Sequence, residues 1–340
     1  MAKERASSLL LKLDFGPEYR DDGATTPLVE TGRFKYFREV GKRRNGSLLT
    51  ANLMFIITFV PLAVVLILLE AFGGVESIAY KLANISSSPY ILSGIGFGQS
   101  ALDSSVVDIK LAILNVYYIL FAFVGLNAFL VCIGFGGMLH LSAKFILNDT
   151  VATKKDNYGN EVPKAIKEFF KGIKRTWKEM CFAGGLLLVL FAGIGNLFIY
   201  FVGLFWQNKA NAGHWIMIIL AGIFAIFMLV FLVQYLPTTV IYDLPFKSKV
   251  KNSLIFSLQF FLQNFGIVVI FSAPIIIACV MNNIYVPVII IAVLLVYGSK
   301  WLSLTLCNYE QYLSEKIISR IYNEKFAKSA KKQKNKKAKK

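Results

Sequence analysis

The chain alternates between long apolar runs and polar segments that are rich in Lys and Arg. A helix of about 20 residues crosses a bilayer core about 30 Å thick, because it pairs its own backbone groups where no water is present. Six runs reach this length, and only Asn282 and Asn283 separate the last two. The runs are 49–70, 112–139, 181–206, 214–236, 259–281 and 284–307. The pattern therefore predicts an all-α polytopic membrane protein with six transmembrane helices.

The basic residues alternate between rich and poor polar segments along the chain. Lys plus Arg number ten in 1–48, two in 73–111, nine in 140–180, one in 207–213, three in 237–258, none in 282–283 and twelve from Lys300 onward. Lys and Arg are retained on the cytoplasmic side of a membrane, so this order indicates six spans with both termini in the cytoplasm. We expect a multi-pass protein of the cell membrane.

Three parts follow from this topology. Residues 1–48 form a cytoplasmic N-terminal segment, and 49–307 form the transmembrane domain. Residues 308–340 form a cytoplasmic helix followed by a Lys-rich disordered tail. Within the transmembrane domain, 73–111 is an outer loop and 140–180 is a cytoplasmic elbow.

The end of the elbow, residues 163–180, is predicted to be a basic amphipathic helix before the third span. Pro163 suits the first helical position, and apolar residues recur on one side of the helix with Lys and Arg on the other. One interpretation is a helix that lies in the interface beside anionic lipid headgroups and sets the angle of the third span. The other is a helix that contacts a partner protein. The candidate interface residues are Phe169, Phe170, Lys171, Lys174, Arg175, Trp177 and Lys178.

A second elbow of similar design precedes the fifth span. Phe246 to Asn252 repeats the aromatic and basic order found at Phe170 to Arg175. A unit of helix, basic elbow and helix could thus occur twice in the same orientation. Chance similarity between two cytoplasmic elbows is the competing explanation.

Amides take the place of charges inside the predicted spans. Buried amides most often pair between helices, and the alternative is that they line a polar path for a solute. Such a path would make the chain an independent small-solute transporter or channel. The candidate path residues are Asn115, Asn127, Asn196 and Gln234.

Composition supports a membrane class and gives no sign of catalysis. The 340 residues are 56% apolar and 17% charged, whereas soluble domains average about 45–50% and about 25%. The chain contains no phosphate-binding glycine loop, no His-Glu-x-x-His and no Gly-x-Ser-x-Gly. Two His and four Cys offer little for a zinc site. We therefore expect no enzyme, no catalytic residue, no metal site and no cofactor.

Much of the net charge of +17 lies in the tail, where seven of the last ten residues are Lys. Such a tail could bind anionic lipid or ribosomal RNA, which would suit a membrane-biogenesis factor. A solvated tail that fixes topology is the third interpretation. Apart from the ribosomal case, we expect no nucleic-acid partner.

Four short segments carry a resemblance to a known family. They are Asn52–Pro61, Gly134–Leu141, Phe169–Lys178 and Asp243–Ser253. With these segments the chain resembles the YesL-type proteins, bacterial integral membrane proteins grouped as a domain of unknown function. The likeness extends over about 35–280.

Two features depart from the family pattern. The outer loop at 73–110 looks like an insertion, and Thr176 stands where the family leads us to expect Asn. The resemblance implies a non-enzymatic accessory role beside a carbohydrate ABC-transport system, with subunits of that transporter as partners. It supplies no catalytic or ligand residue, and homo-oligomerisation stays open.

Overall fold

The computed structural model describes residues 33–71, 106–147, 153–155, 161–280 and 297–314, together with Val293. Apart from one short hairpin of strands, the regular elements of these residues are helices. The helices are α3 (Arg33–Arg43), α4 (Asn45–Ile56), η1 (Ile57–Phe59), α5 (Val60–Ala71), α7 (Val106–Ile146), α8 (Ala165–Leu188), η3 (Val189–Ile194), α9 (Gly195–Trp206), α10 (Ala212–Ile241), α11 (Phe246–Gln259), α12 (Phe261–Val280) and α14 (Ser299–Leu313). The strands are β1 (Thr153–Lys155) and β2 (Glu161–Pro163).

Four helical stretches are long and apolar enough to cross a membrane. They are Asn45–Leu69, Ile113–Ile146, Ala165–Trp206 and Ala212–Ile241. A fifth crossing is possible where α11 and α12 pass the same test together, although they are bent by 90°. The chain is thus an all-α protein with the features of a membrane protein. Half of the sixth predicted span, 284–307, lies outside the described residues, so the count of six and the orientation of the termini stay predictions.

The chain divides into two compact units. Unit 1 comprises 1–54, 135–179 and 230–340, and unit 2 comprises 55–134 and 180–229. The outer loop and the Lys-rich tail fall almost entirely outside the described residues.

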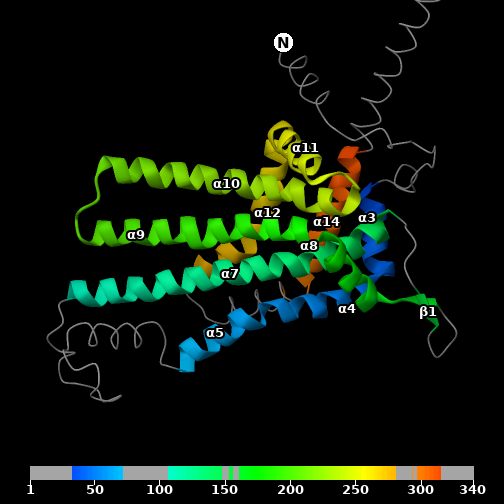
Figure 1. Cartoon of the computed structure of the whole chain (residues 1–340), viewed down its shortest axis with the longest axis horizontal. Helices are drawn as coiled ribbons and strands as arrows, with labels where there is room; N and C mark the ends of the chain where they lie inside the picture. Colours follow the sequence, from blue (N-terminus) through cyan, green and yellow to red (C-terminus); the bar gives the residue numbers. More distant parts are fainter. Residues whose placement is uncertain are drawn as a thin grey trace, which may run out of the picture. The chain divides into compact units, whose positions relative to one another are not determined.

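Unit 2 contains the α9–α10 hairpin, with α9 between α10 and α7 (Figure 1). A Cβ atom at Gly195 of α9 would overlap the ring of Phe121 on α7, so glycine leaves room for the ring in its present position. On the other side of α9, the rings of Phe201 and Trp215 are 4.7 Å apart. Many large apolar side chains of α9 and α10 are exposed, as expected for helices whose solvent is lipid.

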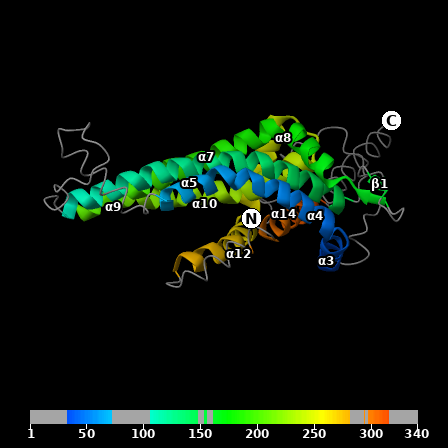
Figure 2. The same ribbon diagram turned by 90° about the horizontal axis from the view of Figure 1, so that it is seen from below.

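Unit 1 has a polar core. Ser142 of α7 hydrogen bonds to Ser303 of α14 at 2.8 Å, and the Tyr36 hydroxyl donates to the Ile146 carbonyl at 2.9 Å. Lys300 donates to the Asn45 side chain at 2.6 Å. Figure 2 shows α14 beside α3 and α4. The first two bonds tie α14 and α3 to the end of α7, and the third ties α14 to α4.

Pro61 modifies the first span as expected of a helical proline. It lacks an N–H and its ring crowds the carbonyl four residues earlier. The backbone adopts the tighter 3₁₀ form just before it, at η1 (Ile57–Phe59). The helix nevertheless continues, because Asn45–Leu69 behaves as one span.

The two elbows follow different paths, which contradicts the repeat hypothesis. The first continues from α8 through η3 to α9 without a break in the helix, Ala165–Trp206. The second bends by 90° between α11 and α12. Their shared order of aromatic and basic residues is therefore a local likeness only.

The position of Pro163 differs from the prediction that it begins a helix. Pro163 ends β2, where it pairs with Thr153, and the helix begins at Ala165.

Candidate functional site

The outward side of α8 carries an apolar stripe bordered by bases. Phe170 and Trp177 are 57% and 49% exposed, and Ile166 is similarly exposed. They recur at the spacing that places side chains on one face of a helix. Six exposed bases flank the stripe: Lys164, Lys167, Lys171, Lys174, Arg175 and Lys178. We name Ile166, Phe170, Trp177 and these six bases the α8 outer face.

Phe169 is turned away from this face, toward the interior of unit 1. It is 2% exposed, and a Cβ atom at Gly137 of α7 would lie 2.7 Å from its ring. The sequence grouped Phe169 with Phe170 as interface residues, but a residue buried against α7 contacts neither lipid nor partner. The prediction for Phe169 is thus corrected, because neighbouring residues point about 100° apart around a helix.

A buried ion cluster holds α8 to α7 just beside Phe169. The Glu168 carboxylate lies 3.0 Å from Lys144 Nζ and 3.6 Å from His140 Nε2. The Glu168 and His140 side chains are almost fully buried. Removing one member of such a cluster is costly because it leaves a buried charge without its partner. Sequence reasoning missed Glu168, although it stands out as an acid among lysines.

Two more ion pairs connect the end of this segment to the α10–α11 connection and to α11. Arg175 lies 2.9 Å from Asp243, and Lys249 lies 3.0 Å from Glu179. Lys249 also donates to the Thr239 carbonyl at 3.2 Å and is nearly buried. The α8 outer face is therefore presented by a helix that is anchored at several points along its length.

The four amides lie in different settings. Asn115 is exposed and Asn127 is buried, and the Asn196 side-chain oxygen accepts no hydrogen bond from any described residue. Gln234 is fully buried and donates to the Asn264 side chain at 2.6 Å. This last contact is the pairing between helices that the sequence offered as the first interpretation.

The packing of α7 on α9 also separates the amides along the helix axis. Gly195 faces Phe121, and Gly203 faces Leu114, so the two helices are antiparallel. Asn196 therefore lies near the level of Phe121, about 9 Å along α7 from Asn127 at 1.5 Å per residue. Asn127 and Asn196 thus lie at different levels along α7 within unit 2.

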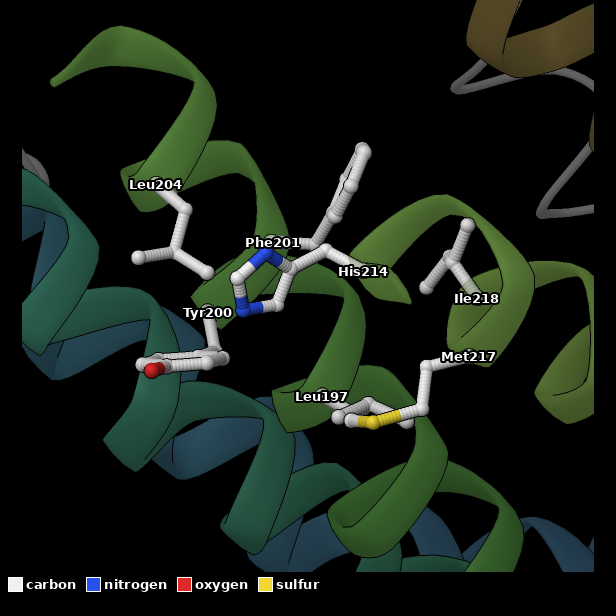
Figure 3. A pocket seen from close by; sticks show the side chains of 7 residues that line it. All are labelled: Leu197, Tyr200, Phe201, Leu204, His214, Met217 and Ile218. Carbon is white, nitrogen blue, oxygen red and sulfur yellow. The ribbon is translucent and has the colours of Figure 1, made fainter. Parts of the chain in front are cut away.

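A small pocket opens between α9 and α10 in unit 2 (Figure 3). Its lining residues are Leu197, Tyr200, Phe201, Leu204, His214, Met217 and Ile218. The cavity holds about 10 Å³, close to the least space that a single water needs. None of the four amides lines it. A substrate-sized solute does not fit.

No group of three or more His, Cys, Asp or Glu side chains suited to a metal ion occurs within the described part of the chain. Comparisons with protein-family models, with curated proteins and with solved structures found no match. The resemblance to YesL-type proteins therefore rests on the four sequence segments alone.

Proposed function

We propose that this chain is a non-enzymatic membrane protein that binds a partner protein through the α8 outer face. Following the family resemblance, the proposed partner is a subunit of a carbohydrate ABC transporter. We further propose that the α8 outer face and both termini lie in the cytoplasm, since the basic segments fall on one side in a six-span topology.

The length of one helical stretch, from α8 through η3 to α9, carries the proposal. Ala165–Trp206 has 42 residues, which extend roughly 63 Å at 1.5 Å per residue. The apolar run 181–206 alone exceeds the bilayer core of about 30 Å. Residues 165–180 belong to the same helical stretch. We propose that they extend out of the bilayer from the span and do not lie flat in the interface.

Trp177 and Phe170 lie at different distances from the start of the apolar run at Cys181. Trp177 is about 6 Å from Cys181, within the depth of the lipid headgroups, whereas Phe170 is about 16 Å away. Trp177 suits the aromatic belt at the membrane surface. Phe170 lies beyond the headgroups with most of its surface exposed. Burying such a side chain against a partner favours binding by about 1.5–3 kcal/mol.

The charges indicate what kind of partner fits. Of the six bases, Arg175 pairs with Asp243, while the other five form no ion pair with the described residues. An acidic surface with an apolar recess for Phe170 would complement both features. Complementary charge speeds association and selects the partner, and burial of the aromatic side chain supplies affinity.

Affinity purification of the tagged chain from its native host in a gentle detergent tests the proposal. Mass spectrometry should find transporter subunits in stoichiometric amount with the wild type. Phe170→Ala should lose them while the yield of the folded chain stays unchanged. The matched control is Phe224→Ala, since Phe224 is about equally exposed but lies on apolar α10.

Three outcomes distinguish the alternatives. Loss of the partner with Phe170→Ala and retention with Phe224→Ala supports the proposal. Retention with both variants contradicts the assigned face. If no protein co-purifies, and Lys171→Glu combined with Lys174→Glu weakens binding to vesicles that contain anionic lipid, the basic residues serve the membrane surface instead.

A further inference from the structure

Glu310 is a fully buried acid in the polar core of unit 1. It lies on α14 with none of its surface exposed. Its Oε1 atom is 3.1 Å from the Thr238 hydroxyl on α10, and the Tyr242 hydroxyl just beyond α10 also interacts with its carboxyl group. Glu310 forms no ion pair with the residues that the structure describes. Within the described part of unit 1, a charge at this position would have no counter-charge and would be poorly solvated.

The hydroxyl of Thr238 has two oxygen neighbours but only one proton. The first neighbour is the Gln234 carbonyl at 2.6 Å, which can only accept. The second is Glu310 Oε1 at 3.1 Å. If Thr238 donates to the closer carbonyl, as Thr does when it bonds back within a helix, its oxygen must accept from Glu310. The carboxyl group can donate only when it carries a proton.

We propose that Glu310 is a buried proton-binding site, in which the carboxylic acid donates its proton to the Thr238 hydroxyl and so joins α14 to α10. The ligand is a single proton taken from water. Release of that proton leaves a carboxylate opposite the oxygen of Thr238. Thr238 must then turn its own proton away from the Gln234 carbonyl to meet the charge. The hydrogen bond between α10 and α14 therefore changes when the Glu310 carboxyl group gains or loses its proton.

The surroundings of Glu310 make its carboxyl group lose its proton near neutral pH. Burial is the largest influence on Glu310 and raises its pKa to about 8. Two titratable groups face the carboxyl: Tyr242 from the end of α10, and Cys307 one turn earlier on α14. The Cys307 thiol donates to the Leu139 carbonyl at 3.6 Å. Neither neighbour brings a positive charge that would stabilise a carboxylate.

Infrared difference spectra of the full chain in detergent, titrated with base, test the proposal. The wild type should lose a carbonyl band of a protonated acid with a midpoint near pH 8. Glu310→Gln should lack that band, whereas Glu39→Gln should retain it. Glu39 is a suitable control because its carboxylate is partly exposed and pairs with Arg43 on the same helix.

A second variant reports the direction of the hydrogen bond. Thr238→Val removes the acceptor of the Glu310 proton, so the midpoint should move to lower pH. If Thr238 instead donates to a carboxylate, the same change moves the midpoint to higher pH and overturns the proposal. A wild-type spectrum with no band that Glu310→Gln removes also overturns it. If Glu310→Gln does not fold, the wild-type titration alone decides whether the chain holds a protonated acid that titrates near pH 8.

Discussion

Gly172 of α8 lies directly against His140 of α7. A Cβ atom at Gly172 would be 2.5 Å from Cβ of His140 and 3.1 Å from the backbone of Gly137. The two helices can approach this closely only because a hydrogen replaces a side chain at the crossing. The crossing in turn brings Glu168 within reach of Lys144 and His140, so a glycine determines the geometry of the ion cluster.

Gly172→Ala should therefore destabilise the chain. The added methyl group meets Cβ of His140 and backbone, which cannot yield as the end of a flexible side chain can, and such overpacking costs about 1–3 kcal/mol. Thermal unfolding in detergent measures the effect. Gly185→Ala is the control, since nothing lies within 4 Å of a Cβ atom there. Equal unfolding temperatures for the two variants would contradict the close crossing.

Phe169→Ala and Phe170→Ala should separate stability from binding. Phe169 is buried against α7, so its truncation leaves a cavity and should cost about 3–5 kcal/mol. Phe170 is exposed, and its truncation should leave the unfolding temperature almost unchanged. The same thermal assay compares them. A larger loss for Phe170→Ala would mean that α8 has the opposite face inward.

Glu168→Gln should destabilise far more than Asp243→Asn. The first change leaves Lys144 beside a neutral amide in a largely buried setting, at a cost of about 3 kcal/mol. The second breaks the pair with Arg175, in which the Asp243 side chain is 90% exposed, and such pairs contribute less than about 1 kcal/mol. Chemical or thermal unfolding at neutral pH measures both. Similar losses would show that the Glu168 cluster is solvated.

Glu310 should make stability fall as pH rises. Its pKa is raised from 4.5 to about 8 in the folded chain, so the folded state holds the proton in a range where the unfolded state has lost it. This contribution is complete below pH 4.5, declines between there and about pH 8, and is absent above. Glu310→Gln removes the titration. The unfolding temperature of the wild type minus that of Glu310→Gln should decline over this window and then level off. A flat difference would exclude a raised pKa.

Several features could be predicted because they depend on neighbours along the chain. The apolar runs, the helical spacing of 163–180 and the effect of Pro61 follow from local backbone and solvation rules. The pairing of Gln234 with another helix also followed from a general rule, since a buried amide needs a partner. Its partner Asn264 is thirty residues away, and nothing local selects it.

Other features could not be predicted from the sequence. Glu310 sits after the last apolar run, where an acid is ordinarily solvated, and it is buried because α14 packs on α10. The sequence suggested two similar elbows, but the unbroken helix of one and the bend of 90° in the other depend on what each helix packs against.

The sequence by itself determined that this is a helical membrane protein with a basic, aromatic segment before an apolar run. Local hydrophobicity and helical period suffice for that. Only the tertiary structure decided that Phe169 points inward and Phe170 outward, that Glu168 and Glu310 are buried, and that α8 continues without a break into its span. Such outcomes depend on contacts between residues far apart in the chain, where close packing at glycines and the desolvation of charges decide the energy.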